Sequence, residues 1–206
     1  MKTFNRTLRM LAATALATTV LLSQAVASPI VSIVPSDQTI NVGDPATIDI
    51  IVSGLTDPVG GFSFNLVFNG VVLTGVSYTN DPDGKMGASP LELSGGFAGG
   101  TGSPLDIFFA ADPTETEASL SASEGVSFRL TNVAFMGAAN GLSLLTLTDV
   151  VLSNWDGTET LAGVEVQNGR ICVGGNCAVV PEPATLLLFG SALGGLAIIR
   201  RRRYSA

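Results

Sequence analysis

Short apolar runs alternate with turn residues along the chain between residues 30 and 173, which is the pattern of consecutive β-strands. The segment 62–68 shows it most clearly, because its apolar side chains occupy every second position. We expect nine such strands, at 30–34, 46–52, 62–68, 71–78, 105–110, 126–136, 142–152, 161–166 and 170–173. About nine short strands in one domain predict an all-β fold, a β-sandwich of jelly-roll type.

Turn residues separate the runs and leave two longer irregular stretches. Asn69-Gly70 is a hairpin-type signal between the strands 62–68 and 71–78. The Gly- and Ser-rich stretch 88–101 predicts a long loop. The acidic stretch 112–125 lacks a helical period, so we expect an irregular segment with at most one helical turn.

The N-terminus has the pattern of a cleavable secretion signal. Three basic residues precede an apolar segment from Met10 to Leu22, which is too short to span a bilayer stably. Ala25 and Ala27 supply the small-x-small pattern that signal peptidase accepts. We therefore place cleavage between Ala27 and Ser28; the alternative is an uncleaved amphipathic or core helix.

The C-terminus combines a proline motif, an apolar helix and a basic cluster. The motif is Pro181-Glu182-Pro183, the helix covers 184–199, and the cluster is Arg200-Arg201-Arg202-Arg203. Sixteen helical residues span roughly 24 Å, which arginine side chains extend by snorkelling. The arginines should stay on the cytoplasmic side and leave the preceding domain outside.

This arrangement resembles the PEP-CTERM sorting signal of Gram-negative bacteria, since motif, Gly-containing helix and arginine cluster occur in the same order near the end of the chain. The resemblance implies that an exosortase processes the chain from an inner-membrane precursor to the cell surface or extracellular matrix. A plain membrane anchor with a chance motif is the alternative. We divide the chain into a signal peptide (1–27), a β domain (28–175), a linker with the motif (176–183), a transmembrane helix (184–199) and a basic cytoplasmic tail (200–206).

The β domain is strongly acidic. Between Asp37 and Glu165 lie sixteen acidic side chains, and only Lys85, Arg129 and Arg170 are basic in the domain. A net charge of about −13 repels phosphate backbones, so nucleic acid is not an expected partner.

The domain also resembles cohesins, the sandwich modules that bind dockerin in cellulosomes. Matching elements include Asn41-Val42-Gly43-Asp44, the segment 60–66 and Gly125-Val126-Ser127-Phe128. These are turns and core positions, so the resemblance implies the cohesin-like fold and not dockerin binding. Where the family has Tyr-Asp-Pro, this chain has Phe68-Asn69-Gly70.

Few residues offer catalytic or metal chemistry. The chain has no His, which excludes common triads and most zinc sites. Asp106 and Asp112 lack the spacing pattern of a glycosidase pair. Asp81 and Asp83 flank a Pro-Gly turn that either binds calcium, the one cofactor we consider, or is an ordinary turn.

Two further features bear on binding and stability. Trp155, the single tryptophan, either stacks on a sugar ring or caps one end of the core. Cys172 and Cys177 bracket a flexible stretch and are expected to form a disulfide outside the cell.

We therefore expect a non-catalytic surface or matrix protein that binds polysaccharide or a dockerin-like protein partner, processed by signal peptidase and exosortase. One alternative is a purely structural matrix or biofilm component without a specific ligand. The other is a secreted hydrolase.

Overall fold

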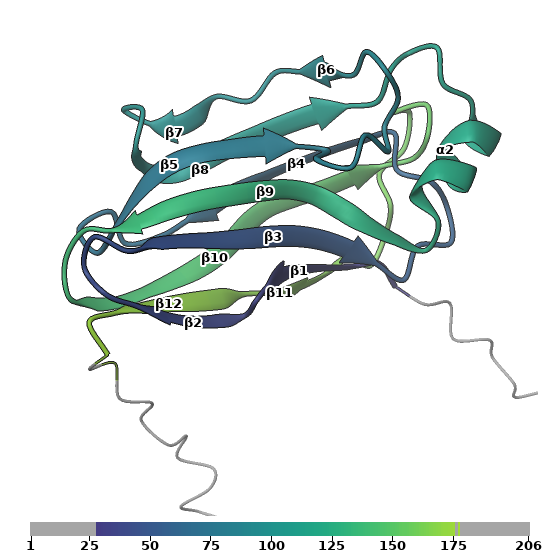
Figure 1. Ribbon diagram of the computed structural model, residues 1–206. Helices are drawn as coiled ribbons and strands as arrows, with labels where there is room; N and C mark the ends of the chain where they lie inside the picture. Colours follow the sequence, from purple (N-terminus) through teal and green to yellow (C-terminus); the bar gives the residue numbers. More distant parts are fainter. Residues whose placement is uncertain (1–27, 176, 178–206) are drawn as a thin grey trace, which may run out of the picture.

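The computed structural model describes residues 28–175 and 177, which form two facing β-sheets and one short helix (Figure 1). The strands are β1 Ile30–Val34, β2 Asp37–Ile40, β3 Pro45–Ser53, β4 Gly61–Val67, β5 Leu73–Asn80, β6 Leu91–Glu92, β7 Gly96–Ala98, β8 Gly102–Ala110, β9 Ser127–Gly137, β10 Gly141–Ser153, β11 Glu165–Gln167 and β12 Gly169–Val173. The helix is α2, Glu117–Glu124. The expected all-β sandwich is confirmed.

The smaller sheet has the strand order β11-β1-β3-β9-β5. The larger has the order β2-β12-β10-β4-β8-β6, and β7 also pairs with β8. Neighbouring strands run antiparallel except for two pairs, β1 with β11 and β2 with β12, which are parallel. Because β1 and β2 belong to different sheets, the start of the domain ties the two sheets together.

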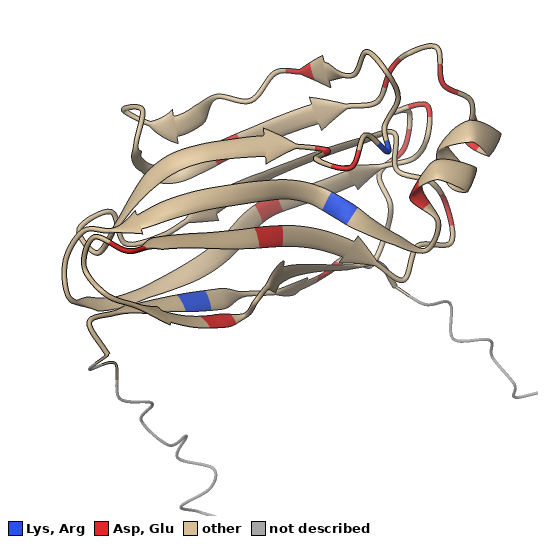
Figure 2. Ribbon diagram, viewed as in Figure 1, with Lys and Arg blue, Asp and Glu red and all other residues tan. Residues whose placement is uncertain are grey.

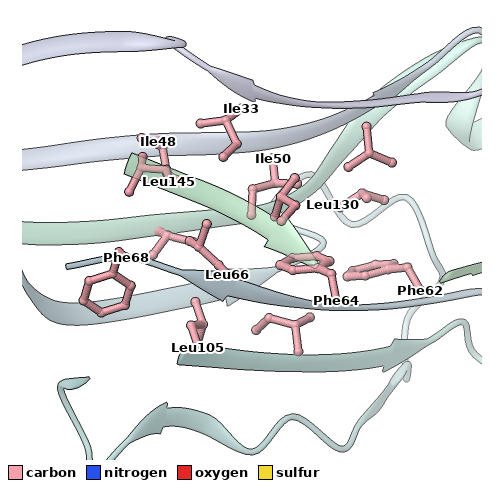
Figure 3. Packing of buried hydrophobic residues seen from close by; sticks show 14 of the residues in the cluster. Ile33, Ile48, Ile50, Phe62, Phe64, Leu66, Phe68, Leu105, Leu130 and Leu145 are labelled. Carbon is pink, nitrogen blue, oxygen red and sulfur yellow. The ribbon is translucent and has the colours of Figure 1, made fainter. Parts of the chain in front are cut away.

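Alternation along the strands builds the core between the sheets (Figure 3). In β4, Phe62, Phe64 and Leu66 are buried while Ser63 and Asn65 point the other way. The Phe62 ring lies 5.4 Å from that of Phe109 in β8. Each such side chain contributes about 1.5 to 3 kcal/mol by leaving water, so the apolar period fixes which face of each strand is inside.

Several predicted boundaries were wrong. The expected loop 88–101 contains β6 and β7, and β2 was missed. Of the strand expected at 161–166, only residues 165 and 166 are in a strand, β11, which ends at Gln167, and the strand expected at 71–78 begins and ends two residues later. The missed strands are short or mostly polar, so tertiary pairing and not local pattern forms them.

The hairpin expected at Asn69-Gly70 is also wrong. A turn is present, since the Asn69 side chain accepts a hydrogen bond from Val71 N at 3.0 Å. However, β4 belongs to the larger sheet and β5 pairs with β9 in the smaller one. The turn therefore carries the chain from one sheet to the other.

The acidic stretch 112–125 forms α2, which is longer than the single turn expected. Thr116 caps its start in a capping box with Ser119, and Gly125 ends it with a φ of +64°. Leu120 and Glu124 are its buried residues, so only one apolar side chain anchors it. Because the helix has no apolar stripe, the residue pattern of this stretch shows no helical period.

Within the described ranges, no helix is long and apolar enough to cross a membrane. The expected signal peptide and transmembrane helix lie outside the described residues.

Candidate binding face

The outer face of the three adjacent strands β10, β4 and β8 exposes large apolar side chains. We refer to it as the β10–β4–β8 face. Leu144 is 61% exposed and Phe108 is 46% exposed, and Val67 and Val151 are also exposed. Soluble domains expose such side chains singly, so several on one flat face mark a candidate contact surface.

Strand register places these side chains in rows across the face. Phe108, Ser63 and Val151 lie opposite one another in a single row. The neighbouring row is polar, with Asp106 opposite Asn65, and Asn65 donates a hydrogen bond to Asp149 at 3.1 Å. The face therefore alternates apolar and polar rows.

At the α2 end of this face the surface is hollowed into a groove of about 510 Å³. The hollow is lined by Gly60 and by the first residues of β4, where Gly61 and Ser63 have short side chains or none. Taller side chains stand on both sides, Phe108 on β8 and Trp155 after β10. The groove volume is in the range of small-ligand sites.

Trp155 stands on a loop that its own hydrogen bonds hold in place. Asn154 N donates to Glu159 O at 2.9 Å, and Asn154 Oδ1 accepts from Glu159 N at 3.1 Å. Asp156 accepts from Thr158 N at 3.0 Å. The loop lies so close to β4 that a Cβ on Gly60 would meet the backbone carbonyls of Asn154 and Trp155. The Trp155 side chain is 40% exposed and is not among the residues of the buried core cluster.

Negative charge gathers in the loops around α2 (Figure 2). The two arginines of the described residues are paired. Arg170 Nε donates to Asp37 at 2.9 Å, and Arg129 Nε donates to Asp83 at 2.9 Å while contacting Asp49 at 3.5 Å. Both pairs raise the pKa of the arginine, chiefly through the side-chain hydrogen bond.

Asp81 and Asp83 do not face a common cation position. The Asp81 carboxylate accepts hydrogen bonds from Lys85 N and Met86 N, both at 2.7 Å. The Asp83 carboxylate is held by Arg129, whose hydrogen bond lowers the pKa of Asp83. Among the described residues no group of three acidic or Cys ligands gathers for a metal, so the calcium expectation for this turn finds no geometric support.

Asp106 and Asp112 lie in different surroundings. Asp106 is exposed on the outer face of β8, whereas Asp112 is buried. Asp112 accepts from Thr114 N at 2.9 Å, Thr114 Oγ1 at 2.7 Å and Ser89 N at 3.0 Å. These bonds, led by the one from Thr114 N, lower the pKa of Asp112 and fix it as a loop brace.

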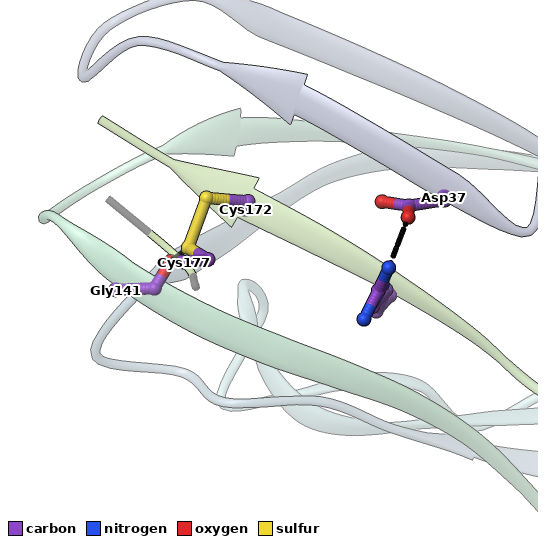
Figure 4. Close-up of a disulfide and its surroundings, with 5 residues drawn as sticks. Asp37, Gly141, Cys172 and Cys177 are labelled. Atoms are coloured by element: carbon purple, nitrogen blue, oxygen red, sulfur yellow. Dashed lines mark hydrogen bonds and ion pairs between the residues drawn. A yellow bond between two sulfur atoms is a disulfide. The ribbon is translucent and has the colours of Figure 1, made fainter. Parts of the chain in front are cut away.

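Cys172 and Cys177 form a disulfide at the opposite end of the sandwich (Figure 4). Cys177 Sγ also lies 3.1 Å from Gly141 O at the start of β10. The bond fastens the end of β12 to the chain that follows it. The signal-cleavage residues Ala25 and Ala27, and the motif residues with the arginine cluster, lie outside the described residues; Ser28 is the first described residue.

Glu124 is a residue that sequence reasoning missed. It is 3% exposed, its Oε2 accepts from Val59 N at 2.8 Å, and its Oε1 has no partner within the described structure. Burial, opposed by the Val59 hydrogen bond and supported by nearby Asp81, raises the pKa of Glu124 to about 7. Its position before a helix-ending glycine gave no sign of burial.

Comparison with known proteins found two similarities, one to a sorting motif and one to a fold. Residues 179–203 match the PEP-CTERM protein-sorting motif. Comparison with the curated proteins gave no match.

The sandwich is similar to solved cohesin structures. A type II cohesin domain from the cellulosome of Acetivibrio cellulolyticus has a TM-score of 0.56 and 19% identity, and the match covers 70% of this chain and 95% of the cohesin. A non-cellulosomal cohesin from Archaeoglobus fulgidus has a TM-score of 0.53 and 16% identity, with 77% and 96% covered. The third cohesin ScaC of A. cellulolyticus, solved in complex with the ScaB dockerin, has a TM-score of 0.53 and 14% identity, with 70% and 98% covered. The chain thus joins a domain of cohesin-like fold to a PEP-CTERM sorting motif.

Proposed function

We propose that the chain is an exported, exosortase-processed protein of the cell surface or extracellular matrix of a Gram-negative bacterium. The observation that carries this is the sorting motif at 179–203, directly after a complete sandwich domain. The N-terminal signal pattern and the cleavage position between Ala27 and Ser28 agree with export. The disulfide also fits an oxidising compartment.

The experiment that tests sorting is the mass of the mature protein from its native host, with and without the exosortase gene. Loss of both end segments, with the C-terminal cut depending on exosortase, is the expected result. An intact tail in both strains would contradict exosortase processing and leave a membrane-anchored sandwich.

The sandwich acts, in this proposal, as a non-catalytic module for a protein partner. Support comes from the exposed apolar side chains of the β10–β4–β8 face and from cohesins of the same fold whose structures contain a dockerin. The carboxylates considered for hydrolysis support this as well, because Asp112 accepts three hydrogen bonds within its own loop while Asp106 is exposed on the outer face of β8. A purely structural matrix component is the alternative.

Site-specific photo-crosslinking in the native host separates these functions. A photoreactive amino acid replaces Leu144 on the β10–β4–β8 face, and the matched control replaces Met136, which is 46% exposed on β9 in the other sheet. We expect a discrete crosslinked product from position 144 only. Equal products, or none, at both positions would favour the structural role.

A further inference from the structure

The groove at the α2 end has two aromatic walls. Trp155 and Phe108 are 40% and 46% exposed, and both line it. Between them lie the first residues of β4, where the outward-facing positions are Gly61 and Ser63, so little side-chain bulk fills the space. An exposed aromatic ring beside an open channel provides a flat apolar surface for a ligand ring.

The loop that carries Trp155 is held in place before any ligand arrives. The hydrogen bonds of Asn154 and Asp156 close the loop on itself, and Gly60 N donates to Ser153 O and Asn154 O, both at 3.1 Å. Ligand binding would therefore order little backbone, and the associated loss of conformational entropy would be small.

The polar lining of the groove selects among ligands. It consists of hydroxyl groups and carboxylates: Ser63, Ser153, Thr160, Asp112, Glu115 and Asp156. None of the described lining residues is Lys or Arg. Asp112 already accepts three hydrogen bonds from Thr114 and Ser89, so Glu115 and Asp156 are the carboxylates offered to a ligand. Ionised carboxylates only accept hydrogen bonds, so they match ligand hydroxyl donors and repel uronate, sulfate or phosphate groups.

We propose that this groove binds an uncharged saccharide chain, with one sugar ring against Trp155 and its hydroxyls toward the carboxylates. A sugar has an apolar C–H face and an edge of hydroxyl donors, which are the two chemistries that the groove presents together. The site goes beyond the protein-partner function, because it uses the end of the face and not the exposed Leu144 and Val67.

The test uses the purified full-length chain and four neutral probes: cellohexaose, laminarihexaose, xylohexaose and N-acetyl-chitohexaose. Trp155 is the chain's single tryptophan, so its emission reports the groove directly. We expect a saturable emission change with at least one probe, and a matching heat of binding by calorimetry.

Variants decide whether the groove carries the binding. Trp155→Ala should weaken calorimetric binding by roughly tenfold or more, and Trp155→Phe should retain part of it. Phe108→Ala should also weaken it, whereas Met136→Ala, which removes an equally exposed side chain from β9, should not. Circular dichroism and thermal unfolding establish that each variant is folded.

Three outcomes would overturn the proposal. One is the absence of binding to all four saccharides. Another is binding that Trp155→Ala leaves unchanged. The third is Trp155-dependent binding of hexa-arginine without any saccharide binding, which would assign the groove to a basic peptide. Each is independent of exosortase processing and of crosslinking at Leu144.

Discussion

The two ends of the sandwich differ in charge, bracing and connection to the rest of the chain. At the α2 end, the connections between strands carry nine carboxylates: Asp57, Asp81, Asp83, Asp112, Glu115, Glu117, Glu124, Asp156 and Glu159. At the opposite end, where Cys172 and Cys177 are bonded, the described connections carry only Asp44. Side-chain hydrogen bonds and a helix brace the first end, and a covalent bond braces the second.

The difference indicates a division of tasks. The chain continues toward the sorting motif from the disulfide end, which is nearly uncharged. The groove and Trp155 lie at the far end, and most of the carboxylates gather there as well (Figure 2). A tethered domain would therefore present its ligand-bearing end away from the attachment point.

The largest expected effect comes from crowding the α2 end. Gly60→Ala should lower the free energy of unfolding by roughly 3 kcal/mol, because the new methyl group meets the backbone carbonyls of Asn154 and Trp155. The matched change at the disulfide end is Gly70→Ala, where nothing lies within 4 Å, and its effect should stay below about 0.5 kcal/mol. Urea unfolding measures both. Equal losses of stability in the two variants would show that the loop carrying Trp155 moves aside without a cost in free energy.

Removing the disulfide tests the other end. The double change Cys172→Ala and Cys177→Ala should cost about 2 kcal/mol, since the bond closes a loop with a sequence separation of 5. Trp155 emission in the folded state should not change, because the two ends are separate. A shifted emission spectrum would contradict that independence.

Glu124 makes the α2 end sensitive to pH near neutrality. Its folded pKa of about 7 lies above the ordinary value of 4.5, so the folded state holds a proton that the unfolded state releases between these values. The contribution of protonated Glu124 to the free energy of unfolding is complete below pH 4.5 and is lost as pH rises through 7. This loss lowers the free energy of unfolding by on the order of 1 to 2 kcal/mol, once solvent screening is allowed for, and Glu124→Gln should remove it. Unfolding titrations at several pH values measure it, and an unchanged slope would contradict it.

The smallest effect is expected from Asp83, and it has the opposite sign. Its hydrogen bond from Arg129 lowers the folded pKa, so this stabilisation is present above the ordinary value and is lost as pH falls through the folded one. In the Asp83→Asn variant, the free energy of unfolding should therefore fall less steeply as the pH is lowered. Added salt should reduce the difference in stability between the variant and the original protein. A salt-independent difference would indicate a packing effect instead.

The sequence predicted the core strands well because their apolar residues alternate along the chain, as in Phe62, Phe64 and Leu66. It could not predict β2, whose mixed residues pair with β12 more than a hundred positions away. The groove could not be predicted from the sequence either. Its shape depends on the register of β4, β8 and β10, which sets Ser63 between Phe108 and Val151. Trp155 was recognised as a candidate, but its 40% exposure depends on how its loop packs in three dimensions, which no local pattern records.

The pairing of the first strands with the last ones limits when the domain can finish folding. Strands β1 and β2 pair with β11 and β12, so each sheet receives one of its parallel partners from the end of the domain. In a chain that crosses a membrane N-terminus first, β1 would lack its parallel partner until β11 had emerged, and β2 would lack its partner until β12 had emerged. Because β12 ends at Val173 and the sorting motif begins at 179, completion of the fold and arrival of the motif would nearly coincide in time.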